Sequence, residues 1–332
     1  NNNYITSENL EQITKSPYKN YTVAKPILGI SKKKNKNKII KIDELKNNCS
    51  KLISTDFLRK RLNHKNIKFH NFSVQKIYKN KKKIILLCKR NNKVVKFIAN
   101  RVVLGCGTMV TTKLILDFLK IKKETKIKHH PRLISAFVSR RKIKSNMTFT
   151  PSLIQIKSKK RNDNYIADIR PGNKLITNAI IDINKLLLPI KYLINFLKDY
   201  LIFSNILLDS THSNLYIKVK SDSDAQIYSK KQKTFMELKK RNFDIFKFLF
   251  KNKVIFPIYK TLFPGIGADY HYFGTIPITN DKKKLSVNEN CQLKNNKSIY
   301  IIDGSVFDFK LNKYPLGVIM ANARRIGDNF KK

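Results

Sequence analysis

The chain has 332 residues, of which 42% are hydrophobic, and this length and content exclude a wholly disordered protein. Its formal net charge of +47 would usually indicate nucleic acid or an anionic membrane surface as a partner. The lysines, however, are spread along the whole chain beside Asn and Ile, as in "KKKNKNKIIKI" at 32–42, so an AT-biased coding sequence explains the charge better than a dedicated partner does.

The first third of the chain predicts a sheet followed by a strand–turn–helix unit. Residues 67–104 show three apolar runs separated by "KNKKK" and "RNNK", which is typical of a β-meander. The last run, 93–104, is continuous like a buried parallel strand. The stretch 105–121, "GCGTMVTTKLILDFLKI", then has glycines, apolar residues at helical spacing, and Thr108 in a position to cap a helix.

The middle of the chain predicts mixed structure. Residues 183–208 are strongly apolar with interspersed charges, which indicates a buried or surface-lying helix and not a membrane span. Residues 215–221 alternate as a strand does. Residues 232–263 are predicted to form a basic amphipathic helix that Pro257 ends or kinks.

The last seventy residues give the clearest pattern. The stretch "SIYIIDGS" at 298–305 predicts a buried strand that ends in Asp303 and Gly304. Residues 315–330 predict a helix with Pro315 near its first position.

Four dispersed cysteines show no zinc-binding spacing and indicate reduced thiols, which favours the cytoplasm. The chain begins without Met and without the apolar core of a signal peptide. We therefore expect that the true start of the protein is missing.

The glycines at 105–107 resemble only the beginning of a dinucleotide-binding loop. "GCGTMV" starts as G-x-G-x-x-G does, but Val110 stands in place of the third glycine. A pyrophosphate site usually needs all three glycines for the tight turn, the close backbone approach and the helix packing. The stretch is therefore interpreted as a tight strand-to-helix turn.

Two polar positions in the tail can carry chemistry. Asp303 and Gly304 follow a buried strand, and open α/β sheets bind ligands at this end of their strands. Either Asp303 accepts from a ribityl hydroxyl and the Gly304 main chain approaches a phosphate, or the two residues form an ordinary turn. His271, in "DYHYFGT", is either a packed residue among aromatics or a general base, since neutral imidazole at pH 7 can take a hydroxyl proton. The adjacent His129 and His130 would point to opposite faces of a strand, so we do not expect a metal site there.

The tail as a whole resembles the C-terminal signature of the glucose–methanol–choline (GMC) flavoprotein oxidoreductases. The similar stretches are "DYHYFGTIPI", "LSVNENCQLKNNKSIYIIDGSVF" and "KYPLGVIMANARRIGD", in this order and spacing. Upstream, "FSVQKI", "ANRVVLGCGT" and "KHHPR" are similar to the family's adenine-side valine, its turn beside the flavin and its Asp-His-Pro segment.

The resemblance implies an FAD enzyme that oxidises an alcohol or a sugar hydroxyl to a carbonyl, with hydride transfer to flavin N5 and His271 as the base. The second active-site position falls by count on Tyr314, with Asn312 as a substitute if the register shifts. Tyr314 would donate a hydrogen bond, because a phenol of pKa ~10 is a poor base at neutral pH. The implied FAD-binding residues are Val74, Gly105, Gly107, Asp303, Gly304, Pro315, Leu316 and Gly317.

One family feature is absent from the sequence. No complete G-x-G-x-x-G is found to hold the FAD diphosphate. A missing N-terminal segment, supplied in cis or by a partner chain, is the simplest explanation, and a degenerate gene remnant is another. We expect the chain on its own to bind FAD poorly.

We therefore predict an α/β (α+β) flavoprotein. Residues 1–131 would form part of a Rossmann-like FAD domain, 132–264 an inserted substrate domain of antiparallel sheet plus helices, and 265–332 the segment that completes the FAD domain. The substrate is a small alcohol or sugar, and the electron acceptor is unknown. One alternative is a basic protein that binds nucleic acid or an anionic membrane surface through residues 183–208 and 232–259. The other is an inactive fragment of a flavoprotein.

Overall fold

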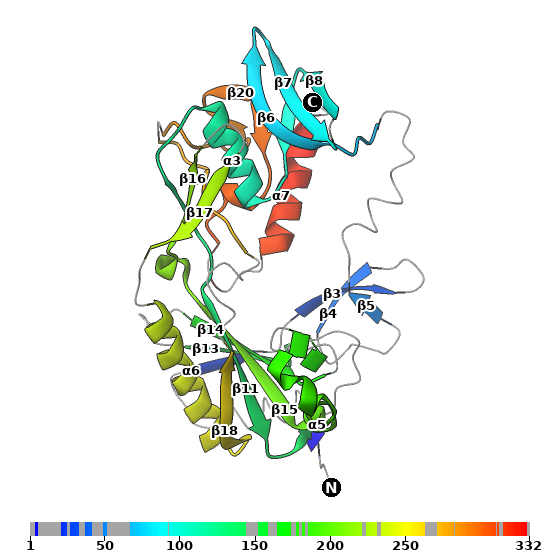
Figure 1. Ribbon diagram of the computed structural model, residues 1–332, viewed down its shortest axis with the longest axis vertical. Coiled ribbons are helices and arrows are strands. Elements are labelled where there is room, and N and C mark those ends of the chain that lie inside the picture. Colours follow the sequence, from blue (N-terminus) through cyan, green and yellow to red (C-terminus); the bar gives the residue numbers. More distant parts are fainter. Residues whose placement is uncertain are drawn as a thin grey trace. The chain divides into compact units, whose positions relative to one another are not determined.

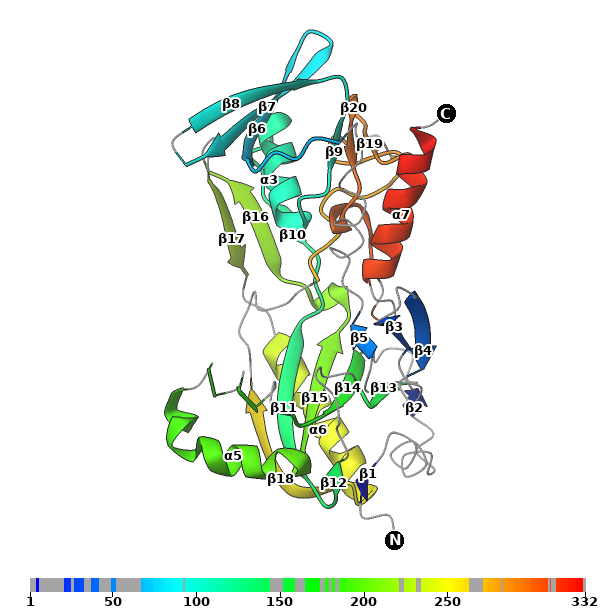
Figure 2. The ribbon, with the colours of Figure 1, turned by 90° about the vertical axis from the view of Figure 1, so that its right-hand side faces the viewer.

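The computed structural model describes a set of segments that together cover most of the chain. They are residues 4–5, 21–24, 27–32, 37–41, 49–51, 67–91, 93–143, 152–158, 165–173, 177–178, 181–182, 185–220, 224–230, 234–262, 271–281, 283–309, 311 and 315–330. Before residue 67 the description is of main-chain strands. Figures 1 and 2 show two views of the ribbon.

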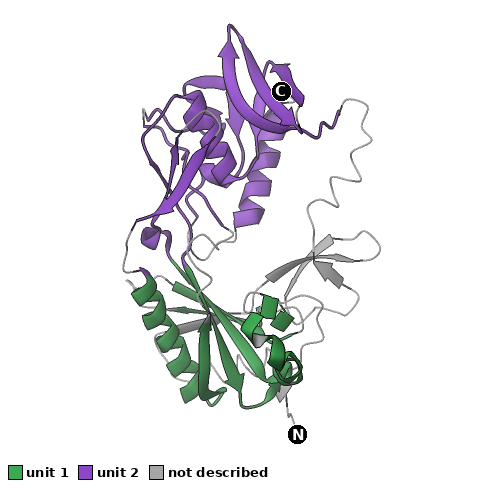
Figure 3. Cartoon of the chain, in the orientation of Figure 1, with its two compact units in different colours: residues 1–67, 132–208, 235–264 green, residues 68–131, 209–234, 265–332 purple. Residues whose placement is uncertain are grey.

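The chain divides into two compact units (Figure 3). Unit 1 comprises 1–67, 132–208 and 235–264, and unit 2 comprises 68–131, 209–234 and 265–332. Each unit contains both helices and sheets, so the predicted mixed class is confirmed. The predicted division of labour between a cofactor-binding and a substrate-binding part concerns what the units bind, and it stays a prediction.

Unit 1 is built on a six-stranded antiparallel sheet in the order β18-β11-β15-β14-β13-β2. Alternate residues of β11 are buried, as a strand with one face on a core requires. The bounds are Tyr21–Ala24 for β2, Arg132–Ser139 for β11, Ile154–Ser158 for β13, Tyr165–Pro171 for β14, Leu201–Leu208 for β15 and Ile255–Leu262 for β18.

The predicted helix over 232–263 is shorter than expected. Helix α6 covers Thr234–Lys251, and Leu238, Ile245 and Leu249 at helical spacing bury its apolar face. The chain then turns at Lys253, where φ is +57°, and continues as β18. Pro257 lies in this edge strand opposite a shift of register in β11, a position where a missing N–H is tolerated.

The predicted helix over 183–208 is correct only for its first part. Residues Lys185–Ile190 form the 3-10 helix η2, Lys191–Leu197 form α5 and Lys198–Tyr200 form the 3-10 helix η3. Residues 201–208 are instead β15, a mostly buried central strand between β11 and β14. The helical part lies on the surface and has no buried side chain in α5.

The remaining strands of unit 1 are short. Strands β3, β4 and β5 make an antiparallel sheet in the order β4-β3-β5, and β1 pairs in parallel with β12. Their bounds are Tyr4–Ile5 for β1, Ile27–Lys32 for β3, Asn37–Lys41 for β4, Cys49–Lys51 for β5 and Lys142–Ile143 for β12.

Unit 2 begins with the meander that the sequence predicts. Strands β6, β7 and β8 pair antiparallel in chain order, at Ser73–Asn80, Lys83–Arg90 and Lys93–Ala99. The last apolar run does not continue as one strand, because β8 ends at Ala99 and a separate strand, β9, covers Val102–Leu104. Strand β9 pairs in parallel with β20, Asn296–Ile301, as expected for a buried strand of its kind.

Helix α3, Thr108–Phe118, follows β9 and completes the predicted strand–turn–helix unit. Its buried residues Leu114 and Ile115 pack in the core of unit 2 with Ile299 and Ile301 of β20. Helix α7, Pro315–Asn329, is also confirmed, and Ile326 joins the same core. The core therefore links segments from both ends of the unit.

The other elements of unit 2 flank this core. Strand β19 pairs antiparallel with β20, and β10, β16 and β17 form an antiparallel sheet. Their bounds are Thr125–Ile127 for β10, Leu215–Val219 for β16, Ala225–Ser229 for β17, Gln292–Leu293 for β19, Ser210–His212 for the 3-10 helix η4 and Gly304–Val306 for the 3-10 helix η5.

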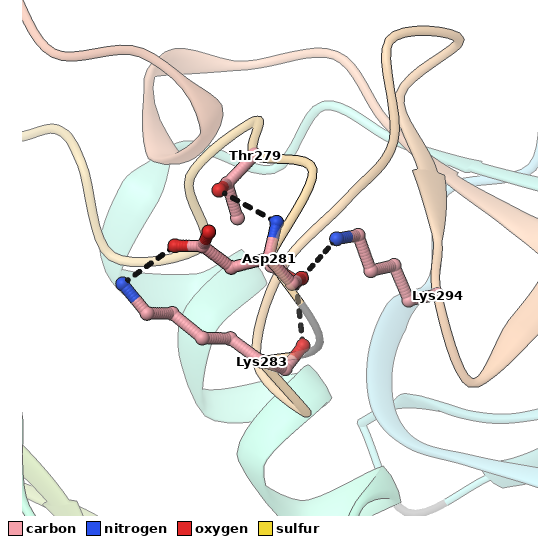
Figure 4. A network of polar contacts seen from close by, with 5 residues as sticks. Thr279, Asp281, Lys283 and Lys294 are labelled. Carbon is pink, nitrogen blue, oxygen red and sulfur yellow. Dashed lines mark hydrogen bonds and ion pairs between the residues drawn. The ribbon is translucent and has the colours of Figure 1, made fainter.

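A polar network holds the surface turn that precedes β19 (Figure 4). The Asp281 N–H donates to Thr279 Oγ1 over 3.1 Å, and Lys283 Nζ lies 3.2 Å from Asp281 Oδ2. Lys294 Nζ donates to the Asp281 carbonyl. The Lys283 ammonium, with help from the Thr279 hydroxyl, lowers the pKa of Asp281. These contacts stabilise the turn locally.

Within the described residues, no helix is long and apolar enough to cross a membrane. In the same part of the chain, Cys88, Cys106 and Cys291 are free thiols, as predicted.

Candidate functional site

The site begins where the parallel strands β9 and β20 end together. Leu104 and Ile301 are paired in the register, and the Ile302 N–H donates to the Leu104 carbonyl over 2.9 Å. The glycines at 105 and 107 follow β9, while Asp303 and Gly304 follow β20. The fold thus brings together four of the predicted cofactor residues at one edge of the sheet.

The carboxylate of Asp303 is buried and accepts four hydrogen bonds. Oδ1 accepts from the Ser305 N–H over 3.0 Å and from the Ser305 hydroxyl over 2.6 Å. Oδ2 accepts from the Gly107 N–H over 3.1 Å and from the Thr111 hydroxyl. A carboxylate offers about four acceptor positions, so the protein itself occupies them.

Asp303 therefore takes the place of an anion at the start of α3. A negative charge is stabilised there, because the first N–H groups of a helix have no partner within the helix. Gly107 is the N-cap residue, with φ 84° and ψ 152°, a conformation reserved almost entirely for glycine. The structure agrees with a strand-to-helix turn and not with a pyrophosphate loop at "GCGTMV".

The predicted cap at Thr108 is wrong. Thr108 is the first helical residue, and no side chain caps the helix from the N-cap position. Its hydroxyl donates instead to the Tyr272 carbonyl. Thr108 thus links α3 by a hydrogen bond to the segment that contains His271.

The segment after His271 is held at almost every residue. Phe273 and Lys128 exchange main-chain hydrogen bonds of 2.9 and 3.0 Å, and the Gly274 N–H donates to the Gly304 carbonyl over 3.1 Å. The hydroxyls of Thr275 and Thr112 are 2.5 Å apart, and the Ile276 N–H donates to the Ser305 carbonyl over 2.8 Å. His271 is therefore the residue just before a firmly anchored strand-like stretch.

Two glycines allow this close approach. Gly274 has a φ of +72°, and a Cβ there would lie 2.9 Å from Lys128 Cδ. A Cβ at Gly304 would lie 3.0 Å from both Thr108 Oγ1 and the Tyr272 carbonyl oxygen. A side chain at Gly274 would press on Lys128, and a side chain at Gly304 would push Thr108 and the Tyr272 carbonyl away.

The side chain of His271 is exposed, whereas Phe273 two residues later is fully buried. His271 is therefore not a core residue packed among aromatics, which was one of the two interpretations of "DYHYFGT". An imidazole in this position is accessible to a small molecule.

His129 and His130 flank the same segment. The His130 ring lies 5.0 Å from that of Phe273, and His129 Nδ1 lies 2.6 Å from Ser213 Oγ. Burial lowers the pKa of His129 to about 4, so this imidazole is neutral at pH 7. Both histidine side chains are buried beside the aromatic residues that follow His271.

Cys106 lies in the turn between β9 and α3. Partial burial of its sulfur and the negative charge of Asp303 raise the pKa of its thiol. It is therefore protonated at neutral pH and is no candidate nucleophile.

The start of α7 approaches the site, and the other predicted residues lie elsewhere. A Cβ at Gly304 would be 3.7 Å from Ile319 Cδ1, while Pro315, Leu316 and Gly317 form the first turn of α7. Val74 lies on β6 opposite Cys88, with its side chain against the core of unit 2. Tyr314 and Asn312 lie outside the described residues.

Several polar residues of the site have no counterpart among the sequence predictions. They are Thr111, Thr112, Ser213, Thr275 and Ser305. The only local signal is the row of hydroxyl residues in "GTMVTT", which is unusual in a helix that otherwise buries apolar side chains. Their partners are up to 192 residues away in the chain, so the pattern alone cannot reveal them.

The described residues fit one end of FAD better than the other. A Cβ added at Gly107 or at Gly317 would meet no atom within 4 Å, so no neighbouring group covers the main chain at these two positions. The diphosphate finds no comparable place here, because Asp303 already occupies the start of α3. The Asp303 carboxylate, with its four protein donors, is a positioning group for the turn and not a free acceptor for a ribityl hydroxyl.

Comparisons with known proteins support the fold only. No family model matches the sequence, and no curated protein matches it. Among solved structures, the chain is similar to pyridoxine 4-oxidase from Mesorbium loti, with a TM-score of 0.53 and 9% sequence identity. The match covers 78% of this chain and 57% of that chain, so this chain spans little more than half the length of its structural neighbour. The chain thus shares a mixed helix-and-sheet fold with an oxidase.

Proposed function

We propose that the chain is part of an FAD-dependent oxidoreductase that acts on CH–OH groups and converts an alcohol or a sugar hydroxyl to a carbonyl. The observation that carries the proposal is the anchoring of the His271 segment. Residues 272–276 are hydrogen-bonded to α3, to Lys128 and to the end of β20, and His271, the residue directly before them, is exposed. The shared fold with an oxidase supports it.

His271 is proposed as the general base. A neutral imidazole can take the hydroxyl proton of a bound alcohol. FAD, when bound, would accept the hydride that leaves the alcohol carbon. Tyr314, or Asn312 in its place, would donate a hydrogen bond to the substrate oxygen.

The glycine turns are proposed to let the main chain approach the flavin. Gly107 and Gly317 are open, and Pro315 and Leu316 share the first turn of α7 with Gly317. A Cβ at Gly105 would lie 3.7 Å from Ile302 Cγ1, whereas the missing side chain at Gly304 lets that turn lie close to the Tyr272 carbonyl of the His271 segment. Asp303 holds the Gly107 N–H and so fixes the shape of this edge.

The adenine and diphosphate end of FAD needs further groups. We propose that the main chain at Val74 meets the adenine, and that the diphosphate is held by a G-x-G-x-x-G segment in cis or in a partner chain. Residues 132–264 would supply the substrate side.

The test uses the full-length protein and the variant His271→Ala. We expect the variant to keep yellow bound flavin but to lose most of the bleaching that an alcohol causes without oxygen, because the proton would have no acceptor. His70→Ala is the matched control, since His70 is an exposed histidine of the same unit outside the anchored segment. Equal bleaching in wild type and His271→Ala would remove His271 from the chemistry, and absence of bound flavin in every form would reject the proposed function.

A further inference from the structure

The helical surface segment 185–200 of unit 1 displays large apolar side chains to solvent. In a water-soluble surface helix such residues normally face the core. Here Tyr192 is 88% exposed and Leu186 87% exposed. The full exposed set is Leu186, Leu188, Ile190, Tyr192, Leu193, Phe196 and Leu197.

The polarity of α5 is the reverse of that of a core-packing helix. Tyr192 and Phe196 are spaced by four residues and lie on one exposed face. On the inner side, Asn195 Oδ1 accepts a hydrogen bond of 3.1 Å from the hydroxyl of Thr177, which is fully buried. The segment therefore turns an amide toward the protein and aromatic rings away from it. Figure 2 shows α5 projecting beyond the strands of the six-stranded sheet.

Cationic side chains accompany these apolar residues. Lys185 and Lys191 are exposed on the same segment. Lys198 Nζ lies 3.6 Å from Oδ2 of Asp199, which is the only acidic residue in the sequence between 185 and 200. The whole chain is also strongly cationic, with a net charge of +47. Exposed aromatic and aliphatic residues with interspersed lysines are typical of helices that lie in a membrane interface.

We propose that residues 185–200 bind an anionic lipid surface, with Tyr192 and Phe196 inserted at the headgroup boundary and Lys185 and Lys191 against the lipid phosphates. A second copy of the chain fits this patch poorly. Two molecules of charge +47 repel each other, and lysines are depleted in the cores of protein–protein interfaces. Nucleic acid would use the lysines but would leave the leucines and the phenylalanine exposed.

The first experiment uses the absence of tryptophan from the chain. In Tyr192→Trp, the indole introduced at position 192 should shift its emission to shorter wavelength when vesicles of phosphatidylcholine with phosphatidylglycerol are added. Brominated lipids should quench it. Ile98→Trp is the control, since Ile98 is an exposed apolar residue of β8 in unit 2, and its emission should not change.

The second experiment measures vesicle affinity by co-sedimentation. Tyr192→Ser and Phe196→Ser should each weaken binding about tenfold, because each removes an aromatic side chain that would be buried at the headgroup boundary of the bound vesicle. Lys185→Gln and Lys191→Gln should each weaken it roughly fivefold, and the loss should shrink at high salt. The matched control Val94→Ser with Ile98→Ser removes two similarly exposed apolar residues and should leave the affinity unchanged.

Three results would overturn the proposal. The first is no binding to anionic vesicles, and the second is equal loss of affinity in the control pair. The third is an emission shift of Tyr192→Trp that depends on protein concentration or on added RNA and not on lipid, since this would assign the patch to self-association or to nucleic acid. None of these results depends on flavin, so they leave the proposed oxidoreductase function untouched.

Discussion

Asp303 and Asp281 lie in the same unit, and each is the centre of a group of hydrogen bonds, but the two groups do different work. Asp303 is 6% exposed and accepts from main-chain and hydroxyl groups of segments almost two hundred residues apart. The Asp281 side chain is 64% exposed, and its partners Thr279, Lys283 and Lys294 all lie within thirteen residues of it (Figure 4).

The difference shows which polar groups determine the architecture of the candidate site. An exposed ion pair gains little, because water screens it and two long side chains lose freedom. If a buried carboxylate loses its donors, the charge is left desolvated and without a partner. If the donors lose the carboxylate, the same happens to the donors. We therefore expect the position of the β9–α3 turn to depend on Asp303, and the local surface turn alone to depend on Asp281.

The largest expected effect comes from Asp303→Ala. The change leaves the Gly107 N–H and the Thr111 and Ser305 hydroxyls without their acceptor, and the free energy of unfolding should fall by about 3 kcal/mol. Urea unfolding followed by circular dichroism measures it. Asp281→Ala serves as the matched carboxylate control, and an equal loss in both variants would erase the distinction between the two regions.

His129 extends the comparison to a buried base. Its folded pKa is about 4 against 6.5 for a free imidazole. Above pH 6.5 the side chain is neutral in both states and has no effect. As the pH falls from 6.5 to 4, only the unfolded chain takes up the proton, so stability declines by up to about 3 kcal/mol.

The measurement is the pH dependence of urea unfolding for wild type and His129→Gln. The wild-type curve should fall more steeply than that of the variant between pH 6.5 and 4, and the two should run parallel above pH 6.5. Parallel curves over the whole range would show that burial does not depress the pKa of His129.

Gly107→Ala tests the main-chain donor of the hydrogen bonds around Asp303, the Gly107 N–H. With φ at 84° and ψ at 152°, a Cβ strains the main chain, and we expect a loss of about 2 kcal/mol in unfolding free energy. Gly327→Ala in α7 is the control, because a Cβ added at this position would meet no atom within 4 Å. Alanine is favoured over glycine in a helix by about 1 kcal/mol, so this variant should lose no stability. A neutral Gly107→Ala would mean that the turn can relax without the Asp303 contact.

The smallest effect is expected at Asp281. Asp281→Asn removes the charge that faces Lys283, and the midpoint of thermal unfolding at pH 7 should stay within experimental error of wild type. The lowered pKa implies that any small contribution is present above the ordinary pKa of the carboxyl and is lost as the pH falls below it. A clear drop at pH 7 would show that the surface turn also determines the fold of the unit.

The sequence predicts the elements of unit 2 well because their patterns are unambiguous. The meander at 73–99 has turn residues between its strands, and α7 begins at a proline. The run 201–208 is different, since a mostly buried central strand shows no clean alternation of apolar and polar residues and cannot be told from the helix before it. The mixed fold class can be predicted from the local patterns of unit 2. The strand at 201–208 can be identified only once its neighbours in the sheet are known.

The site could be predicted only in part. The chemistry-bearing types at Asp303, Gly107 and His271 stand out in the chain, and the fold brings the segments that contain them together. What Asp303 does there could not be predicted, because its donors Gly107 and Thr111 lie 196 and 192 residues away. Local pattern carries no information on which hydroxyls will meet a carboxylate across the sheet.

The most direct test of the proposed function is reduction of the bound flavin by an alcohol. The full-length protein, purified with its flavin, is mixed without oxygen with a panel of alcohols and sugars, each with hydrogen or deuterium on the carbinol carbon. We predict that at least one substrate bleaches the flavin absorption and that deuterium slows the bleaching, since the hydride leaves that carbon. No bound FAD, or bleaching by no member of the panel, would contradict the account.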